Sequence, residues 1–166
     1  MDQRNNRIIY RSDKYGELPQ ISALMEAVFQ DCIAPGYDPQ GIDEFLQYIH
    51  PTAIAYRLKR NHFLRVAEVE GNIVGVLEMR TYHHLSLLFV DRKFQRQGIA
   101  KRLVQEAIAI CHAENPQLQN ITVHANPGAI PAYKAMQFQI VGEERVENGI
   151  RYVPMRHELE QKNQSH

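Results

Sequence analysis

The residues best suited to chemistry gather between Leu85 and Cys111, where an apolar stretch, a basic loop and an amphipathic stretch follow one another. The loop and the residues just after it carry five cations: Arg92, Lys93, Arg96, Lys101 and Arg102. A helix N-terminus already presents positive charge through its macrodipole and its unpaired first-turn N–H groups, so cations there oppose it unless an anion binds. We therefore predict a phosphate or pyrophosphate site, with Gly98 letting the ligand approach the backbone. The alternative is a solvated basic turn.

Two nucleotide motifs do not fit this loop. No Gly-Lys-Ser/Thr follows, which excludes a P-loop, and the spaced glycines of a dinucleotide fingerprint are absent. The run Gln95-Arg96-Gln97-Gly98-Ile99-Ala100 instead resembles the Gln/Arg-x-x-Gly-x-Gly/Ala signature of the GNAT superfamily of acetyl-CoA-dependent N-acetyltransferases. The run from Asn126 to Phe138 resembles the second motif of that family, an Asn that ends a strand followed by a short helix carrying a tyrosine, here Tyr133. Gln137 departs from the pattern, since a glycine commonly precedes the phenylalanine.

The resemblance implies acetyl-CoA as the co-substrate. It also implies which residues bind it: Leu88, Phe89, Val90, Gln95, Arg96, Gln97, Gly98, Ile99, Ala100, Lys101, Asn126 and Tyr133. In the family, the strands corresponding to residues 85–90 and 121–126 splay apart, and the pantetheine arm lies between them. A splayed strand leaves backbone groups unpaired, and we expect Leu88 and Val90 to pair with the pantetheine. The side chains of these strand residues are expected to fill the core.

Acetyl transfer to an amine needs three functions. An alkylamine holds its proton with a pKa near ~10.4, so a base or a water must remove that proton before attack. A strand amide must stabilise the oxyanion, and the resemblance implies that of Leu88 or Phe89. The departing thiolate needs a proton, and Tyr133 stands in the matching position for that acid. Its structural alternative is an aromatic residue that packs the short helix with its hydroxyl hydrogen-bonded.

His84 is the first candidate for the base. It stands at the start of the motif strand, where members of the family place a Glu or a His that works through water, and a neutral imidazole suits the task. His83 and His84 are expected on opposite sheet faces, so at least one of them should have no role in catalysis. Their separation also makes them a poor metal pair, so no metal is predicted.

Glu78 is the second candidate for the base. It lies in an apolar run, Val74 to Met79, where burial would raise its pKa towards a useful range. Two alternatives remain: an ion pair between Glu78 and Arg80 or Arg65, or ordered water as the base.

Hydrophobic periodicity supplies the elements that position these residues. Period-two patterns predict strands over residues 7–11, 63–70, 73–81, 84–90, 120–126, 138–146 and 150–157, and helical spacing predicts helices over 18–31, 39–59 with a break at Pro51, 99–113 and 129–136. The predicted fold is an α/β, GNAT-like mixed and mostly antiparallel central sheet of about seven strands, with helices on both faces and a splay between the fourth and fifth strands. Residues 1–159 are expected to form a single N-acetyltransferase domain, with a polar tail over 160–166.

Composition and charge limit the classes of partner that the protein is expected to bind. The chain of 166 residues is 44% apolar and carries 19 basic and 19 acidic residues, so net charge recommends neither nucleic acid nor membrane. No apolar run approaches the ~20 residues of a transmembrane helix. Met1 to Asn6 is too polar to open a signal peptide, which makes a cytoplasmic location the default, and Cys32 and Cys111 are expected to be free thiols.

The acceptor is expected to be the amine of a small molecule or an exposed protein amine. In the family the acceptor site is shaped by the first two helices and the last hairpin, here residues 29–42 and 143–152. These ranges contain Asp31, Tyr37, Asp38, Glu143, Glu144 and Glu147, and a solvated surface is the alternative for most of them. A non-catalytic acyl-CoA-binding module is the alternative function, and the last hairpin offers an edge for a homodimer.

Overall fold

The protein is described by a computed structural model that covers residues 7–160 in detail. The polar segments expected at the two ends, residues 1–6 and most of the predicted tail, lie outside the described residues. The strands are β1 (Ile8–Ser12), β2 (His62–Val69), β3 (Asn72–Arg80), β4 (His84–Val90), β5 (Asn120–Ala125), β6 (Gln139–Ile140), β7 (Arg145–Glu147) and β8 (Ile150–Glu158). The helices are α1 (Leu18–Cys32), α2 (Pro39–Tyr48), α3 (Pro51–Leu58), α4 (Ile99–Glu114) and α5 (Ile130–Ala135), with short 3₁₀ turns η1 (Ala34–Gly36), η2 (Arg92–Phe94) and η3 (Pro127–Ala129).

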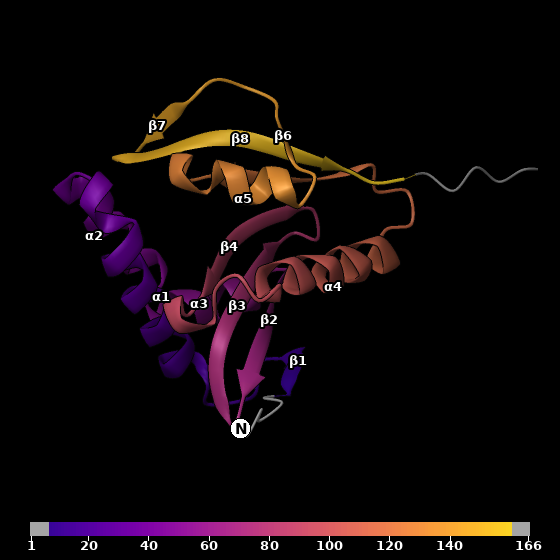
Figure 1. Ribbon diagram of the computed structural model, residues 1–166, viewed down its shortest axis with the longest axis horizontal. Helices are drawn as coiled ribbons and strands as arrows, with labels where there is room; N and C mark the ends of the chain where they lie inside the picture. Colours follow the sequence, from indigo (N-terminus) through magenta and orange to yellow (C-terminus); the bar gives the residue numbers. More distant parts are fainter. Residues whose placement is uncertain (1–6, 161–166) are drawn as a thin grey trace, which may run out of the picture.

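The strands form one mixed sheet in the order β1-β2-β3-β4-β5-β8-β6, and β7 pairs with the first three residues of β8. Among the strands described, only β4 and β5 pair in parallel. Helices α1 to α3 cover one face of the sheet, and α4 and α5 cover the other (Figure 1). Strand alternation divides the core accordingly: Val76 and Phe89 face the first three helices, whereas Leu77 and Val90 face α4. The predicted fold class is confirmed.

A glycine in β3 lets α4 lie close to the sheet. A Cβ added to Gly75 would stand 3.0 Å from Ile99 Cγ2 and 3.3 Å from Leu103 Cδ1. Both partners are fully buried residues in the first two turns of α4. The tight packing at Gly75 therefore fixes the N-terminus of α4 beside the end of β4.

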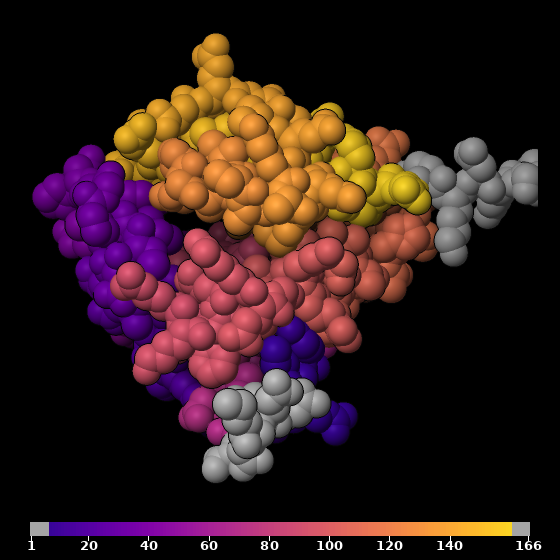
Figure 2. Space-filling view, viewed as in Figure 1, coloured from indigo at the N-terminus to yellow at the C-terminus, as the bar shows by residue number. Residues whose placement is uncertain are grey.

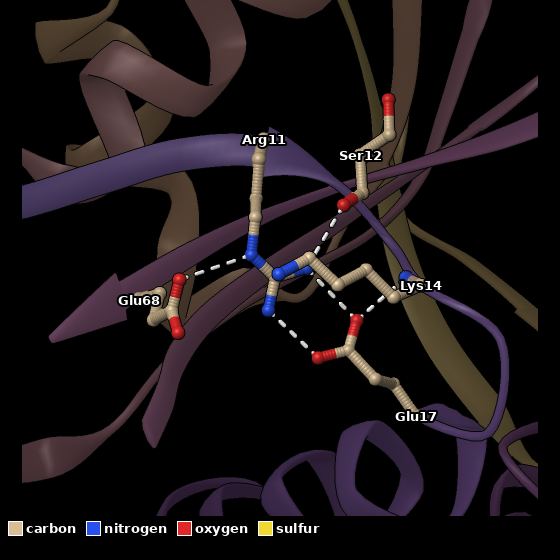
Figure 3. Close-up of polar contacts among 5 residues, drawn as sticks. All are labelled: Arg11, Ser12, Lys14, Glu17 and Glu68. Atoms are coloured by element: carbon tan, nitrogen blue, oxygen red, sulfur yellow. Dashed lines mark hydrogen bonds and ion pairs between the residues drawn. The ribbon is translucent and has the colours of Figure 1, made fainter. Parts of the chain in front are cut away.

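An ion-pair network ties β1 and β2 to the start of α1 (Figure 3). Arg11 donates to both carboxylate oxygens of Glu17, at 2.8 and 2.7 Å, and to Glu68 Oε2 at 3.1 Å. Glu17 also accepts from the backbone N–H of Lys14 at 2.6 Å. The hydrogen bonds from Arg11, reinforced by the one from Lys14, lower the pKa of Glu17 to about 2 against the opposing effect of burial.

Because its pKa is lower in the folded state, Glu17 stabilises the fold above its unfolded pKa of 4.5, and this contribution is lost as the pH falls towards about 2. The Glu17→Gln variant is expected to lose about 1 to 2 kcal/mol of unfolding free energy at pH 7. Urea denaturation at a series of pH values should show this difference shrinking between pH 4.5 and about 2. Glu26→Gln, an exposed glutamate of the same helix, is the control and should show no such loss. If the difference in unfolding free energy between the wild type and Glu17→Gln stayed constant across that pH range, the lowered pKa of Glu17 would be contradicted.

The last hairpin differs from the prediction. The single strand expected over residues 138–146 is two short strands, β6 and β7, which gives eight strands within the described residues. A Cβ added to Gly142 would stand 2.7 Å from Pro154 Cγ of the partner strand, and Pro154 has no N–H to donate. The ladder is interrupted after the bond from Val141 N to Pro154 O. The turn at Asn148 and Gly149 forms where it was predicted, with both residues at positive φ.

Candidate active site

The parallel pairing of β4 with β5 stops after two residues. The pairs described are His84 with Thr122 and Leu85 with Val123, and from there the two strands diverge. The N–H of Asp91 donates to Val74 O of β3 at 2.7 Å. Backbone groups alternate in direction along a strand, so Phe89 also faces β3, while Leu88 and Val90 face the gap. Of the two amides considered for an oxyanion, the geometry favours Leu88, and Phe89 contributes its side chain to the core.

The loop after β4 leads directly from this gap to α4. Asp91 caps η2 by accepting from Lys93 N at 2.9 Å, and Gln95 Nε2 donates to Val90 O at 3.1 Å. Arg96 and Gly98 both have positive φ, and Gly98 is the N-cap of α4 with no side-chain cap. The first intrahelical bond described here runs from Arg102 N to Gly98 O. The N–H groups of residues 99–101 are therefore available to a ligand.

The cations of the loop fall into two groups. Arg102 pairs with Glu106 at 2.9 Å and lies over the ring of Tyr10, so it belongs to the surface of α4. The other four are exposed and make no ion pair within residues 7–160: Arg92, Lys93, Arg96 and Lys101. Figure 2 shows the surface hollowed between this segment, drawn in salmon, and the orange C-terminal part. Positive charge and unpaired amides thus stand together at the mouth of the hollow.

Tyr133 lies in α5, on the α4 face of the sheet. Its ring is 8% exposed and packs edge-on against Phe138 at 5.4 Å. Burial raises the pKa of the Tyr133 phenol, which keeps it protonated at neutral pH. Its hydroxyl makes no hydrogen bond among the described residues, in contrast to the purely structural alternative. Asn126, which precedes α5, caps η3 by accepting from Gly128 N at 2.9 Å.

His84 is half-buried at the point where β4 and β5 separate. Its Nδ1 is 2.7 Å from Thr122 Oγ1, and its ring meets that of His124 edge to face at 4.6 Å. Burial, reinforced by His124 and Arg80, lowers the pKa of His84 to about 4, so the imidazole is neutral at pH 7. His83 is exposed in the turn before β4, where its Nδ1 lies 2.9 Å from Thr81 O.

Thr122 and His124 contact His84, and Tyr152 stacks on His124; the sequence motifs singled out none of these three, whereas Glu147 was among the acceptor candidates. Thr122 and His124 lie on the same face of β5, and His124 stacks on Tyr152 of β8 with ring centroids 4.2 Å apart. The hydroxyl of Tyr152 donates to Glu147 Oε1 at 2.8 Å. In the sequence, the polar residues at 120, 122 and 124 form a period-two pattern. That pattern was the only available signal that one face of β5 is polar beside His84.

Glu78 is buried as expected, but its predicted partners are wrong. Its carboxylate receives Arg57 Nε at 2.7 Å and Arg57 Nη2 at 2.9 Å, and His62 Nδ1 lies at 3.0 Å. Arg65 instead pairs with Glu106 of α4. With both oxygens engaged, Glu78 ties β3 to α3, and the geometry favours this structural role over that of a base.

Within residues 7–160, no group of three or more His, Cys, Asp and Glu residues is placed to hold a metal ion. No helix in this part of the chain is long and apolar enough to cross a membrane. Cys32 is exposed and Cys111 buried, and both are free thiols.

Comparison with known proteins decides the family. Residues 33–159 match the family model described as "Acetyltransferase (GNAT) domain". The chain belongs to the GNAT family of acetyltransferases. Among curated proteins, this GNAT chain is 28% identical over 142 residues to the uncharacterized N-acetyltransferase YafP of Escherichia coli (strain K12), covering 86% of this chain and 88% of the relative.

Solved structures support the GNAT fold. The PaiA N-acetyltransferase of Thermoplasma acidophilum, solved in complex with coenzyme A, superposes with a TM-score of 0.76 at 13% identity, covering 92% of this chain and 99% of that one. A GNAT acetyltransferase from Elizabethkingia anophelis with acetyl-CoA bound gives a TM-score of 0.58 at 20% identity, covering 94% of this chain and all of that one.

Proposed function

We propose that this GNAT acetyltransferase moves an acetyl group from acetyl-CoA to a primary amine within a ternary complex. The gap between β4 and β5 carries the proposal, because it exposes the backbone of Leu88 and the N–H of Val90 and ends at the cationic N-terminus of α4. An extended pantetheine can pair with the open edge of β4 as a strand would. Its diphosphate would then reach the N–H groups of residues 99–101 and the cations Arg92, Lys93, Arg96 and Lys101.

The chemistry follows from the groups around the gap. The amine nitrogen attacks the thioester carbon and passes its proton to His84, directly or through water. The N–H of Leu88 stabilises the tetrahedral oxyanion. When the carbon–sulfur bond breaks, the coenzyme A thiolate takes a proton from Tyr133, whose phenol burial keeps protonated. His84 then releases its proton to solvent and the Tyr133 phenolate takes one up, which restores both residues and leaves the amide product and coenzyme A.

Two measurements test the proposal. Isothermal titration calorimetry should detect coenzyme A binding, and a thiol-release assay with acetyl-CoA and a panel of primary amines should detect amine-dependent turnover. Binding without turnover on any amine would favour the alternative, a non-catalytic acyl-CoA-binding module. No binding at all would contradict both.

Thr122 should act as a positioning residue for His84. If His84 donates from Nδ1 to Thr122 Oγ1, its Nε2 lone pair is left to accept the amine proton. Thr122→Val keeps the shape but removes the oxygen, and we expect it to lower kcat by about 10- to 100-fold, whereas Thr122→Ser retains the oxygen and most of the activity.

The pH profile of kcat checks the protonation state of His84 that this role requires. A base works above its own pKa, and the lowered pKa of His84 places the acid limb of kcat near pH 4 in the wild type. In Thr122→Val the activity should fall across the whole plateau. Equal kcat values for the valine and serine variants would contradict the positioning role.

A further inference from the structure

Helix α2 and the last hairpin touch through their backbones. The Asn148-Gly149 turn that joins β7 and β8 lies against the first turn of α2, where Asp38 accepts from Gly41 N at 2.9 Å. A Cβ added to Gly41 would overlap Gly149 O, and a Cβ added to Gly149 would stand 2.6 Å from Asp38 Oδ1 and 2.7 Å from Gly41 N. We call this approach of Gly41 and Gly149 the glycine contact. No side chain fits between the two backbones.

The same segment reaches both sides of the gap between β4 and β5. Phe45 of α2 packs on Phe89 of β4, with ring centroids 5.8 Å apart. Tyr37, just before α2, accepts a hydrogen bond at 3.5 Å from Asn126 Nδ2 at the end of β5. With the glycine contact at β8, residues 37–45 therefore span the diverging strands on the face opposite α4 (Figure 1). In Figure 2 the purple surface of these helices meets the orange surface of the hairpin without a break.

This span restricts how an acceptor reaches the thioester. A helix with its side chains is about 10–12 Å across, so α2 and its contact with the hairpin keep a folded protein surface that far from the gap. His124 and Glu147 are exposed, and His124 packs edge to face on half-buried His84, so we place the approach of the acceptor on this side. Building on the proposed function, we propose that the acceptor is a small free amine and not a lysine or N-terminus displayed by a folded protein.

The first test compares acceptors on the wild-type protein. Acetyl transfer is measured with free alkyl, aromatic, amino-acid and polyamine substrates, and with ubiquitin as a folded protein bearing exposed lysines. The best free amine should exceed ubiquitin in kcat/KM by at least about 100-fold. A comparable or higher kcat/KM for ubiquitin would overturn this inference while leaving the acetyltransferase proposal standing. Acetylation of neither class, with coenzyme A bound, would refute the proposed function and this inference with it.

The second test opens the glycine contact. Gly41→Ala and Gly149→Ala should each push the hairpin away from α2 and raise the ratio of ubiquitin to free-amine kcat/KM by about tenfold, with unchanged coenzyme A affinity. Gly71→Ala is the matched control for Gly149→Ala, because Gly71 holds the same turn position between β2 and β3 at a φ of 81° against 78°, with nothing within 4 Å of an added Cβ. It should leave the ratio unchanged. Folded variants whose ratio equals that of the control would overturn the inference.

Discussion

Replacing Gly98 with aspartate is expected to weaken coenzyme A binding by about 30- to 150-fold, which corresponds to about 2 to 3 kcal/mol. The N-cap of α4 is where we place the diphosphate, and a carboxylate there would repel it and compete for the first-turn N–H groups. Nothing lies within 4 Å of a Cβ added at Gly98, so the fold should survive, and aspartate tolerates the positive φ better than most residues. Calorimetry with coenzyme A measures the loss.

Gly16→Asp is the control for this substitution. Gly16 precedes α1, has a φ of 84° and has equally open surroundings, so the change adds the same backbone strain and the same charge at another helix start. Its affinity for coenzyme A should stay within about twofold of the wild type. A folded Gly98→Asp protein that binds as tightly as this control would refute the diphosphate site.

Removing the hydroxyl of Tyr133 should slow the chemical step. Tyr133→Phe keeps the ring that packs against Phe138 but leaves no acid for the departing thiolate, and kcat is expected to fall by about 100-fold. Because the ring remains, the KM for acetyl-CoA should change by less than about threefold. Steady-state kinetics separates the two parameters.

Tyr10→Phe serves as the matched control for Tyr133→Phe. Tyr10 also packs beside α4, but its ring lies under Arg102 and away from the gap, so loss of its hydroxyl should leave kcat unchanged. A purely structural Tyr133 would likewise tolerate phenylalanine. Unaltered kcat in Tyr133→Phe would therefore remove Tyr133 from the mechanism.

Much of the fold was readable from the sequence because its elements have strong local signals. The apolar spacing of α4 and the alternation of β2 and β3 predicted those elements to within one or two residues. The break of the last hairpin was not predictable, because it depends on Gly142 meeting Pro154 of the partner strand. A local pattern carries no information about such a tertiary contact.

The candidate site also has parts that the sequence predicted and parts that depend on tertiary contacts. The motif around Gly98 marks a helix start, and the structure places four unpaired cations there, as far as the described residues show. Glu78 was assigned the wrong partners because Arg57 comes from α3 and not from the neighbouring strands. Thr122 lies 38 residues from His84 and becomes its partner only through the parallel pairing of β4 with β5. Its role needed the strand order, which periodicity does not supply.

The glycine contact also bears on how the protein can vary. Gly41 and Gly149 lie far apart in the chain, yet neither backbone has room for a side chain while the other stays in place. A substitution at either position can therefore be accommodated only if the hairpin and α2 move apart. Because the contact is made largely by main-chain atoms, side-chain replacements elsewhere leave its dimensions unchanged.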